Sequence, residues 1–297
     1  MRHGIVILPQ GAWREQADRW RRAEELGFHT GWTYDHLSWN PLDGEDWGAA
    51  IPTLTAAALV TRRLRIGTFV ASPNFRHPVS FARELATLDA VAGGRLTLGV
   101  GSGSATSDAP VLGSEPLSPR ARHARFDEFV RHLDVLLRFE PEGADGIHLE
   151  GEWFRAVRAR MVGAPEQSPR LPFVVAADGP RGIALAAELG DGWVTLGPKG
   201  VTDDADWWSG VAERAARMEE ALVAAGRDTA GFTRVLSLDA GPVFSLESAE
   251  RYREYVARAA ELGFTDVVAH WPRASRRYVG DERVLEEIAP VLADRTR

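Results

Sequence analysis

The stretch from Arg65 to Gly103 constrains the fold more than any other part of the chain. It begins with a β-branched run, 65–70, which predicts a buried strand. Apolar residues then recur at spacings of four, three and four from 81 to 92, which predicts one face of a helix that ends at two glycines. A second apolar strand, 96–100, leads into Gly101-Ser102-Gly103-Ser104. Two parallel strands joined by a helix place the loops that follow them at one end of a sheet, where α/β proteins bind ligands.

The same alternation continues along the whole chain. We expect strands at 4–8, 30–34, 65–70, 96–100, 173–177, 193–196, 232–238 and 266–269. We expect helices at 13–26, 53–61, 81–92, 119–138, 181–189, 206–225, 248–262 and 281–292. Eight strand–helix units in 297 residues favour a closed parallel barrel over a Rossmann-like open sheet. We therefore predict an α/β fold, a (β/α)8 TIM barrel, as a single domain over 1–297 with insertions in the loops at the C-terminal ends of the strands.

Two segments interrupt this alternation. Residues 104–119 form a long run of small and polar residues, and a connection of this length is a functional lid or a disordered segment. Residues 143–154, with a glycine at 151, predict a small hairpin outside the barrel.

Composition excludes several classes of function. A net charge of −7 argues against nucleic acid as a partner, and the absence of cysteine excludes disulfides and thiolate chemistry. No apolar run approaches the length of a membrane span, and the first residues lack the apolar core of a signal peptide. The histidines are scattered without a metal-ligand pattern, so we predict no metal site. We expect a soluble, cytoplasmic protein with a small-molecule substrate.

Candidate site residues are those that directly follow the predicted strands, because barrel chemistry lies in these loops. His36 is the first candidate for acid–base work, since a histidine titrates near neutral pH and the adjacent Asp35 carboxylate can set its tautomer. Neighbours along a strand point to opposite faces, so a simple loop pair remains the alternative. Trp39 lines a pocket or caps the barrel. The other strand-end residues are Pro9, Gln10, Phe69, Val70, Ser72, Asn74, Thr195, Lys199, His270 and Trp271.

Two glycine-containing loops suggest contact with a flat or anionic ligand. The run Gly101–Ser104 partly imitates a dinucleotide fingerprint, but it follows the fourth strand and leads into a loop, which argues against a Rossmann site. Asp178-Gly179-Pro180 opens a helix after a late strand, where phosphate often binds. The Asp178 carboxylate would repel phosphate unless it turns away to cap the helix. We expect Arg122 and Arg125 to be solvated on the polar side of their helix.

The segments LRIGTFVASPNFRHP and ATLDAVAGGRLTLGVGSG resemble the luciferase-like flavin and deazaflavin oxidoreductases. YDHL, AEELGF and AADGP…ELGDGW resemble further motifs of that family, clearly over residues 4–200 and loosely beyond. The resemblance implies a (β/α)8 barrel that binds coenzyme F420 or FMN at the C-terminal ends of its strands. It also implies a homodimer, for which aromatic residues such as Trp207 and Trp208 offer an exposed surface.

The resemblance assigns roles to particular residues. It implies a bulge behind the cofactor ring at Phe69-Val70, with a cis peptide between them in the F420 branch. It implies that His36 exchanges the substrate proton and that Trp39 shapes the substrate pocket. The residues that it implies for cofactor binding are Asp35, Phe69, Val70, Gly101, Ser102, Gly103, Ser104, Ser107, Ala177, Asp178, Gly179, Pro180, Gly192 and Trp193.

The chain departs from one branch of the family at two positions. F420-dependent glucose-6-phosphate dehydrogenases carry glutamates where this chain has Gln10 and Ser104, although Lys199 falls near a lysine that they use for sugar phosphate. We therefore expect an F420-dependent oxidoreductase with another substrate. An FMN-dependent monooxygenase supplied by a reductase partner is one alternative, and a non-catalytic flavin-binding protein is another.

Overall fold

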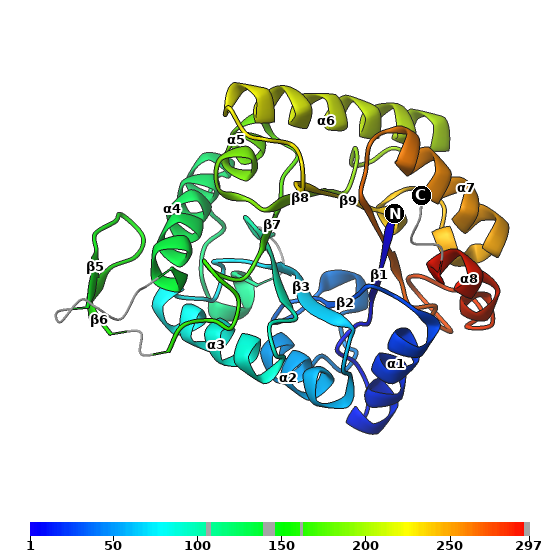
Figure 1. The fold of residues 1–297 in the computed structure, drawn as a ribbon, viewed down its shortest axis with the longest axis horizontal. Helices are drawn as coiled ribbons and strands as arrows, with labels where there is room; N and C mark the ends of the chain where they lie inside the picture. Colours follow the sequence, from blue (N-terminus) through cyan, green and yellow to red (C-terminus); the bar gives the residue numbers. More distant parts are fainter. Residues whose placement is uncertain (105–107, 139–145, 161–162, 294–297) are drawn as a thin grey trace.

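Eight parallel strands close into a barrel in the order β1-β10-β9-β8-β7-β4-β3-β2 (Figure 1). The computed structural model describes residues 1–104, 108–138, 146–160 and 163–293. The barrel strands are β1 Arg2–Val6, β2 Thr30–Thr33, β3 Arg65–Ala71, β4 Leu96–Gly101, β7 Phe173–Ala176, β8 Gly192–Thr195, β9 Thr233–Ser237 and β10 Asp266–His270. The predicted (β/α)8 barrel is confirmed.

Helices surround the barrel on its outside (Figure 1). They are α1 Trp13–Leu26, α2 Ala50–Val60, α3 Pro78–Val91, α4 Pro119–Leu137, α5 Pro180–Leu189, α6 Asp204–Ala224, α7 Ala249–Glu261 and α8 Val284–Ala293. The boundaries differ from the predicted ones by a few residues. The predicted hairpin exists as antiparallel β5 Ile147–Leu149 and β6 Ala156–Ala159, beside α4, although its second strand lies later than expected and 143–145 lie outside the described residues.

The barrel interior is filled by apolar side chains that alternate with outward-facing ones along each strand. This inner cluster comprises Val6, Leu8, Trp32, Leu42, Phe69, Val174, Val194, Val235 and Val268. The larger core lies between the strands and the helices. Trp207 and Trp208 belong to that outer core, at 0% and 3% exposure, where they pack against Tyr255. The expectation that they offer an exposed dimer surface is therefore wrong, because the apolar face of α6 that carries them packs inward.

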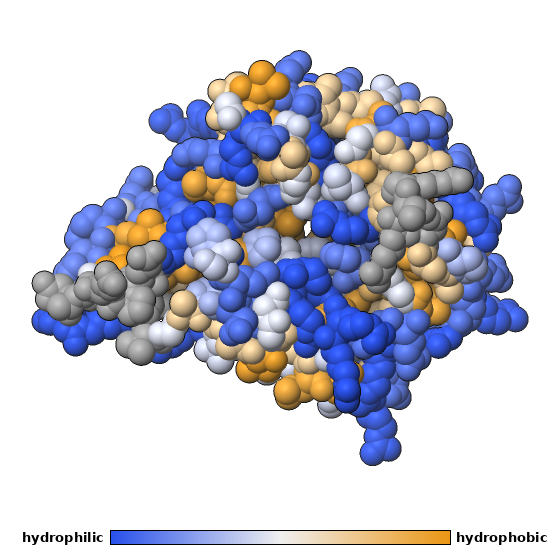
Figure 2. Space-filling model, viewed as in Figure 1, coloured by the Kyte–Doolittle hydropathy of each residue, from blue (hydrophilic) through white to orange (hydrophobic). Residues whose placement is uncertain are grey.

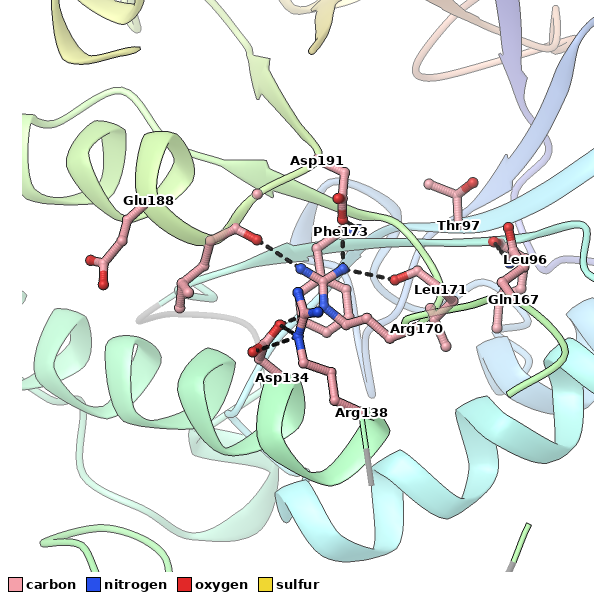
Figure 3. Close-up of polar contacts among 12 residues, drawn as sticks. Leu96, Thr97, Asp134, Arg138, Gln167, Arg170, Leu171, Phe173, Glu188 and Asp191 are labelled. Carbon is pink, nitrogen blue, oxygen red and sulfur yellow. Dashed lines mark hydrogen bonds and ion pairs between the residues drawn. The ribbon is translucent and has the colours of Figure 1, made fainter. Parts of the chain in front are cut away.

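The start of β7 is held by a buried arginine (Figure 3). The Arg170 guanidinium donates to Asp134 of α4 at 2.6 Å and to Asp191, before β8, at 2.5 Å. It also donates to the backbone carbonyls of Leu171 and Leu189, at 2.9 and 2.8 Å, and lies 3.7 Å above the Phe173 ring. These contacts tie α4, α5, β7 and β8 together at the N-terminal end of the barrel.

Several helices begin with sequence signals that fix the loops before them. Ser118 caps α4 by accepting from the Ala121 N–H, and Pro119 takes the first helical position. Gly179 precedes α5 and Pro180 begins it, without any side-chain cap. The α4 and α5 N-termini thereby lie next to the C-terminal ends of β4 and β7.

The outer surface seen in Figure 2 is mostly hydrophilic, with apolar residues in separate groups. Among the described residues, none of the helices has both the length and the apolar character needed to cross a membrane.

Candidate active site

A cavity of about 930 Å³ opens at the C-terminal ends of the barrel strands. This volume lies near the upper end of the range of roughly 300–1,000 Å³ for small-molecule and cofactor sites. Twelve of the predicted site residues line it: His36, Trp39, Phe69, Val70, Gly101, Ser102, Gly103, Ser104, Ala177, Asp178, Gly179 and Pro180. Lys199 and His270, which were singled out as strand-end residues, line it as well.

His36 lies in the loop after β2 and is held by a carboxylate from another loop. Its Nδ1 lies 3.1 Å from an oxygen of Asp108, whose side chain is fully buried while that of His36 is 17% exposed. Asp108 also accepts from the Leu37 backbone N–H at 2.9 Å and from Asn74 at 3.1 Å. Burial raises the pKa of Asp108, but these hydrogen bonds outweigh burial and hold that pKa below its ordinary value. Asp108 therefore remains a carboxylate that orients the imidazole and leaves Nε2 for a ligand.

Asp35 does not lie at the cavity. Its carboxylate is buried and accepts two hydrogen bonds from Arg76, at 2.7 and 2.8 Å. Adjacent residues in extended backbone point to opposite sides, so the chain that turns His36 inward turns Asp35 outward. The predicted pairing of the Asp35 carboxylate with His36 is wrong, and Asp108 takes that part.

Asn74 extends the network behind Asp108. Its amide donates to Asp108 and to the Ser104 carbonyl, and its oxygen accepts from Arg125 at 2.6 Å. Arg125 is thus half-buried and bound to Asn74, so the expectation that it is solvated is wrong; Arg122 is partly exposed and lines the cavity. Gly103 has a φ of +75° and a Cβ there would lie 2.6 Å from the Asn74 amide nitrogen, so its glycine is required by packing.

The predicted bulge and cis peptide between Phe69 and Val70 are both confirmed. The register between β3 and β4 shifts from Thr68 to Ala71 at this point. A Cβ on Gly99 would lie 2.0 Å from the Thr68 carbonyl oxygen, so only glycine lets β4 pass the bulge. The glycines of β4 therefore serve the approach of two backbones as well as the cavity wall.

A second set of polar groups, which sequence reasoning largely missed, lies on another wall of the cavity. His270, at the end of β10, places Nδ1 3.0 Å from Asp239 and Nε2 2.8 Å from the Tyr34 hydroxyl. The Tyr34 hydroxyl lies 3.2 Å from that of Tyr278. Tyr34 lies two residues before His36 and so shares its inward face, and Asp239 directly follows β9. Both positions could therefore have been predicted as site residues from the sequence. Burial lowers the pKa of His270 and raises that of Tyr34.

The mouth of the cavity is cationic in a protein whose net charge is −7. The lining cations in the described residues are Arg120, Arg122, Arg181, Lys199 and Arg277. Asp178 turns toward β8 and α6, where it accepts from Thr195 and lies 3.3 Å from Arg214, rather than capping α5. The first turn of α5 lines the cavity and has no side-chain cap, which favours an anionic ligand group.

Three predicted cofactor residues remain. The structure does not bring Gly192 or Trp193 to the cavity, and Ser107 lies outside the described residues. Trp193 is fully buried, packs against Phe264 at 5.9 Å, and donates its indole N–H to the Ala177 carbonyl. It supports the loop before α5 from behind. In the described parts of the chain, no three histidine, aspartate or glutamate side chains gather as a metal site.

A model of the luciferase-like monooxygenase family matches residues 1–293. The chain belongs to this family. The cavity of this luciferase-like protein is bordered by the β3 bulge, the β4 glycines and the start of α5, which are the segments that carried the resemblance in the sequence.

Two relatives of this luciferase-like protein cover most of its chain. An F420-dependent glucose-6-phosphate dehydrogenase of Amycolatopsis mediterranei is 32% identical over 291 residues, 91% of this chain and 83% of the relative. A 4-hydroxyprotoasukamycin monooxygenase of Streptomyces nodosus subsp. asukaensis is 30% identical over 264 residues, 86% of this chain and 62% of the relative. A solved structure of an F420-dependent secondary alcohol dehydrogenase with an F420-acetone adduct shares the fold, with a TM-score of 0.79, 20% identity and 99% of each chain covered.

Proposed function

We propose that this protein is an F420-dependent oxidoreductase that transfers a hydride between the deazaflavin and a small organic substrate. The observation that carries the proposal is the 32% identity to an F420-dependent dehydrogenase over 91% of the chain. The cavity supports it, because its walls suit a large, flat and anionic cofactor. When bound, F420 supplies a ring carbon that accepts or releases hydride.

The residues present fit such a cofactor. Phe69, Val70 and the backbone of 101–104 form a wall for its ring system. The first turn of α5 and the Arg181 side chain provide N–H groups and positive charge for its phosphate. Asp178 does not oppose a phosphate there, because Thr195 and Arg214 hold its carboxylate away from α5.

His36 is the proposed proton-exchanging group. Asp108 fixes its Nδ1, so Nε2 is the nitrogen available to a ligand in the cavity. Trp39 packs edge-on against Tyr34 at 5.0 Å and, with it, shapes the substrate side of the cavity. The substrate is proposed to differ from glucose 6-phosphate, since Gln10 binds Glu45 at 2.9 Å instead of lining the cavity.

Fluorescence titration of the purified protein with F420 and, separately, with FMN tests the cofactor. We expect saturable binding of F420 and much weaker binding of FMN. Arg181→Ala should weaken F420 binding about tenfold, because it removes a charge that meets phosphate. Arg217→Ala is the matched control, since Arg217 pairs with Glu213 on the surface of α6 and should leave binding unchanged. Tight FMN binding without F420 binding would instead favour an FMN-dependent monooxygenase; one relative is named as a monooxygenase.

A further inference from the structure

The hydrogen bonds around His270 form a chain with a defined direction. Asp239 accepts from the backbone N–H of His270 at 2.6 Å and lies 3.0 Å from its Nδ1, while its other oxygen accepts from Ser245 N–H. A carboxylate only accepts, so Nδ1 carries the proton and Nε2 is an acceptor. Tyr34 must then donate its hydroxyl to Nε2, and the Tyr34 oxygen is left to accept from Tyr278. The oxygen of Tyr278, a residue that lines the cavity, is the accepting end of the chain, and the Arg277 side chain also hydrogen-bonds to it.

Burial and nearby charges set which groups along this chain hold protons before a substrate binds. Burial lowers the pKa of His270, although Asp239 opposes that shift, so the imidazole is neutral near pH 7. Burial likewise raises the pKa of Tyr34 and of Tyr278, so both phenols keep their protons. Arg277, the other charged group that acts on His270, further lowers its pKa. Asp239 is the group that would stabilise the cationic form of His270 when Nε2 takes a proton, whereas burial and Arg277 favour return of that proton.

Tyr278 is held in place by an unusual backbone and by a pinned loop. Its φ is +58°, a conformation that bulky residues seldom adopt and that tends to occur at functional sites. Its ring stacks on His270 with centroids 3.8 Å apart and planes 12° from parallel. Glu45 fixes the loop before Tyr278 by accepting from Arg273 at 2.5 Å and from Arg276 at 3.1 Å. These contacts fix the position of the Tyr278 hydroxyl.

We propose that Tyr278, Tyr34 and His270 form a proton relay that takes the hydroxyl proton of an alcohol substrate. In oxidation the substrate O–H bond breaks and its proton joins Tyr278, whose own proton joins Tyr34, whose proton joins Nε2 of His270. The electron pair of the neighbouring C–H bond leaves as hydride to the cofactor, and a carbonyl forms. Both tyrosines end neutral, with Tyr278 now donating toward the carbonyl oxygen. Reduction runs the same transfers in reverse.

The relay deepens the proposed function, on which it rests. Oxidation of an alcohol by a hydride acceptor of this kind involves two proton exchanges, one at the substrate oxygen and one at the reduced acceptor. The cavity holds two histidine–aspartate pairs from different loops, His36 with Asp108 and His270 with Asp239. The relay takes the first exchange, which the sequence resemblance had given to His36, and the Nε2 of His36 serves the second.

Nitrogen NMR of the cofactor-free protein tests the relay without any turnover. We expect the His270 signals of a neutral ring protonated at Nδ1, and Tyr34→Phe should shift the Nε2 signal while leaving His36 unchanged. A ring protonated at Nε2, or a cationic ring at pH 7, overturns the proposal. This arm is independent of F420 binding, so its failure is distinguishable from a failure of the proposed function.

Turnover of a panel of secondary alcohols, such as cyclohexanol, with F420 tests the chemistry. Tyr34→Phe should lower kcat about 100-fold and remove one ionisation from the pH profile of kcat, with F420 binding retained. Tyr252→Phe is the matched control, because it deletes a buried tyrosine hydroxyl that bonds a histidine, His3, away from the cavity. Equal activity of the two variants, or no turnover of any alcohol, overturns the proposal.

Discussion

The two ends of the barrel both contain buried charged or titratable groups, yet they use them differently. At the N-terminal end, Arg170 directs every guanidinium nitrogen to a carboxylate or a backbone carbonyl (Figure 3). At the C-terminal end, His36 binds a carboxylate through Nδ1 only, whereas His270 binds Asp239 through Nδ1 and Tyr34 through Nε2, and both histidines line the cavity. Arg170 has all its nitrogens bound within the protein and holds structure, whereas His36 keeps Nε2 for a ligand and the hydrogen bonds from His270 lead through Tyr34 to Tyr278 at the cavity. The comparison predicts stability defects at one end and activity defects at the other.

The largest effect should come from Arg170→Met. The change removes the buried partner of Asp134 and Asp191, but Asp134 keeps Arg138 and Asp191 is half-exposed, so we expect a loss of about 3 kcal/mol of unfolding free energy. Urea unfolding should show this loss, while F420 affinity of the folded protein stays the same. Arg138→Met is the control, since Arg138 binds the same Asp134 from a more exposed position and should cost less than about 1 kcal/mol. Equal losses in the two variants would contradict the assignment of Arg170 as a structural anchor.

His36→Ala should act at the C-terminal end of the barrel and lower activity rather than stability. Removal of the proton-exchanging imidazole should lower kcat by about 100-fold or more, with a small change in the melting temperature. Steady-state kinetics with F420 and differential scanning fluorimetry measure the two effects. His148→Ala, on the exposed hairpin, is the control and should change neither. Unchanged turnover in His36→Ala would remove His36 from the mechanism.

The barrel could be predicted from the sequence because its signals are local. The periodicity of apolar residues predicts each strand of four to seven residues and the helix after it. Glycines such as Gly27, with a φ of +97°, mark the ends of helices. Placing the site after the strands then followed from the topology. His36 and the 101–104 loop were found this way.

The partners of the site residues could not be predicted because they depend on contacts between distant segments. Asp108 lies 72 positions from His36, and Tyr278 lies 244 positions from Tyr34. The sequence also does not predict the direction of a side chain where a strand passes into a loop, because the alternation of faces ends there. Asp35 was predicted at the cofactor ring because it adjoins His36, and Trp193 was predicted at the cofactor because of the strand that carries it. Both side chains face away from the cavity.

The smallest of these effects should come from Asp108→Asn, which alters the support of His36 without removing it. An amide can donate to Nδ1 and so favour the wrong tautomer, and we expect kcat/KM to fall about tenfold, or about 1.4 kcal/mol. The pKa of Asp108 in the folded protein lies below its ordinary value of 3.8. Its carboxylate therefore stabilises the fold above that value, and this contribution is lost as pH falls through the lower, folded pKa.

The difference in unfolding free energy between wild type and Asp108→Asn should consequently be largest near pH 7 and shrink below about pH 4. Urea unfolding at several pH values measures it. Asp127→Asn supplies the control, because Asp127 pairs with Arg131 on the surface of α4 and should show little difference at any pH. A difference for Asp108→Asn that grows as the pH falls would mean that Asp108 is protonated in the folded protein, and the orientation of His36 would then need another explanation.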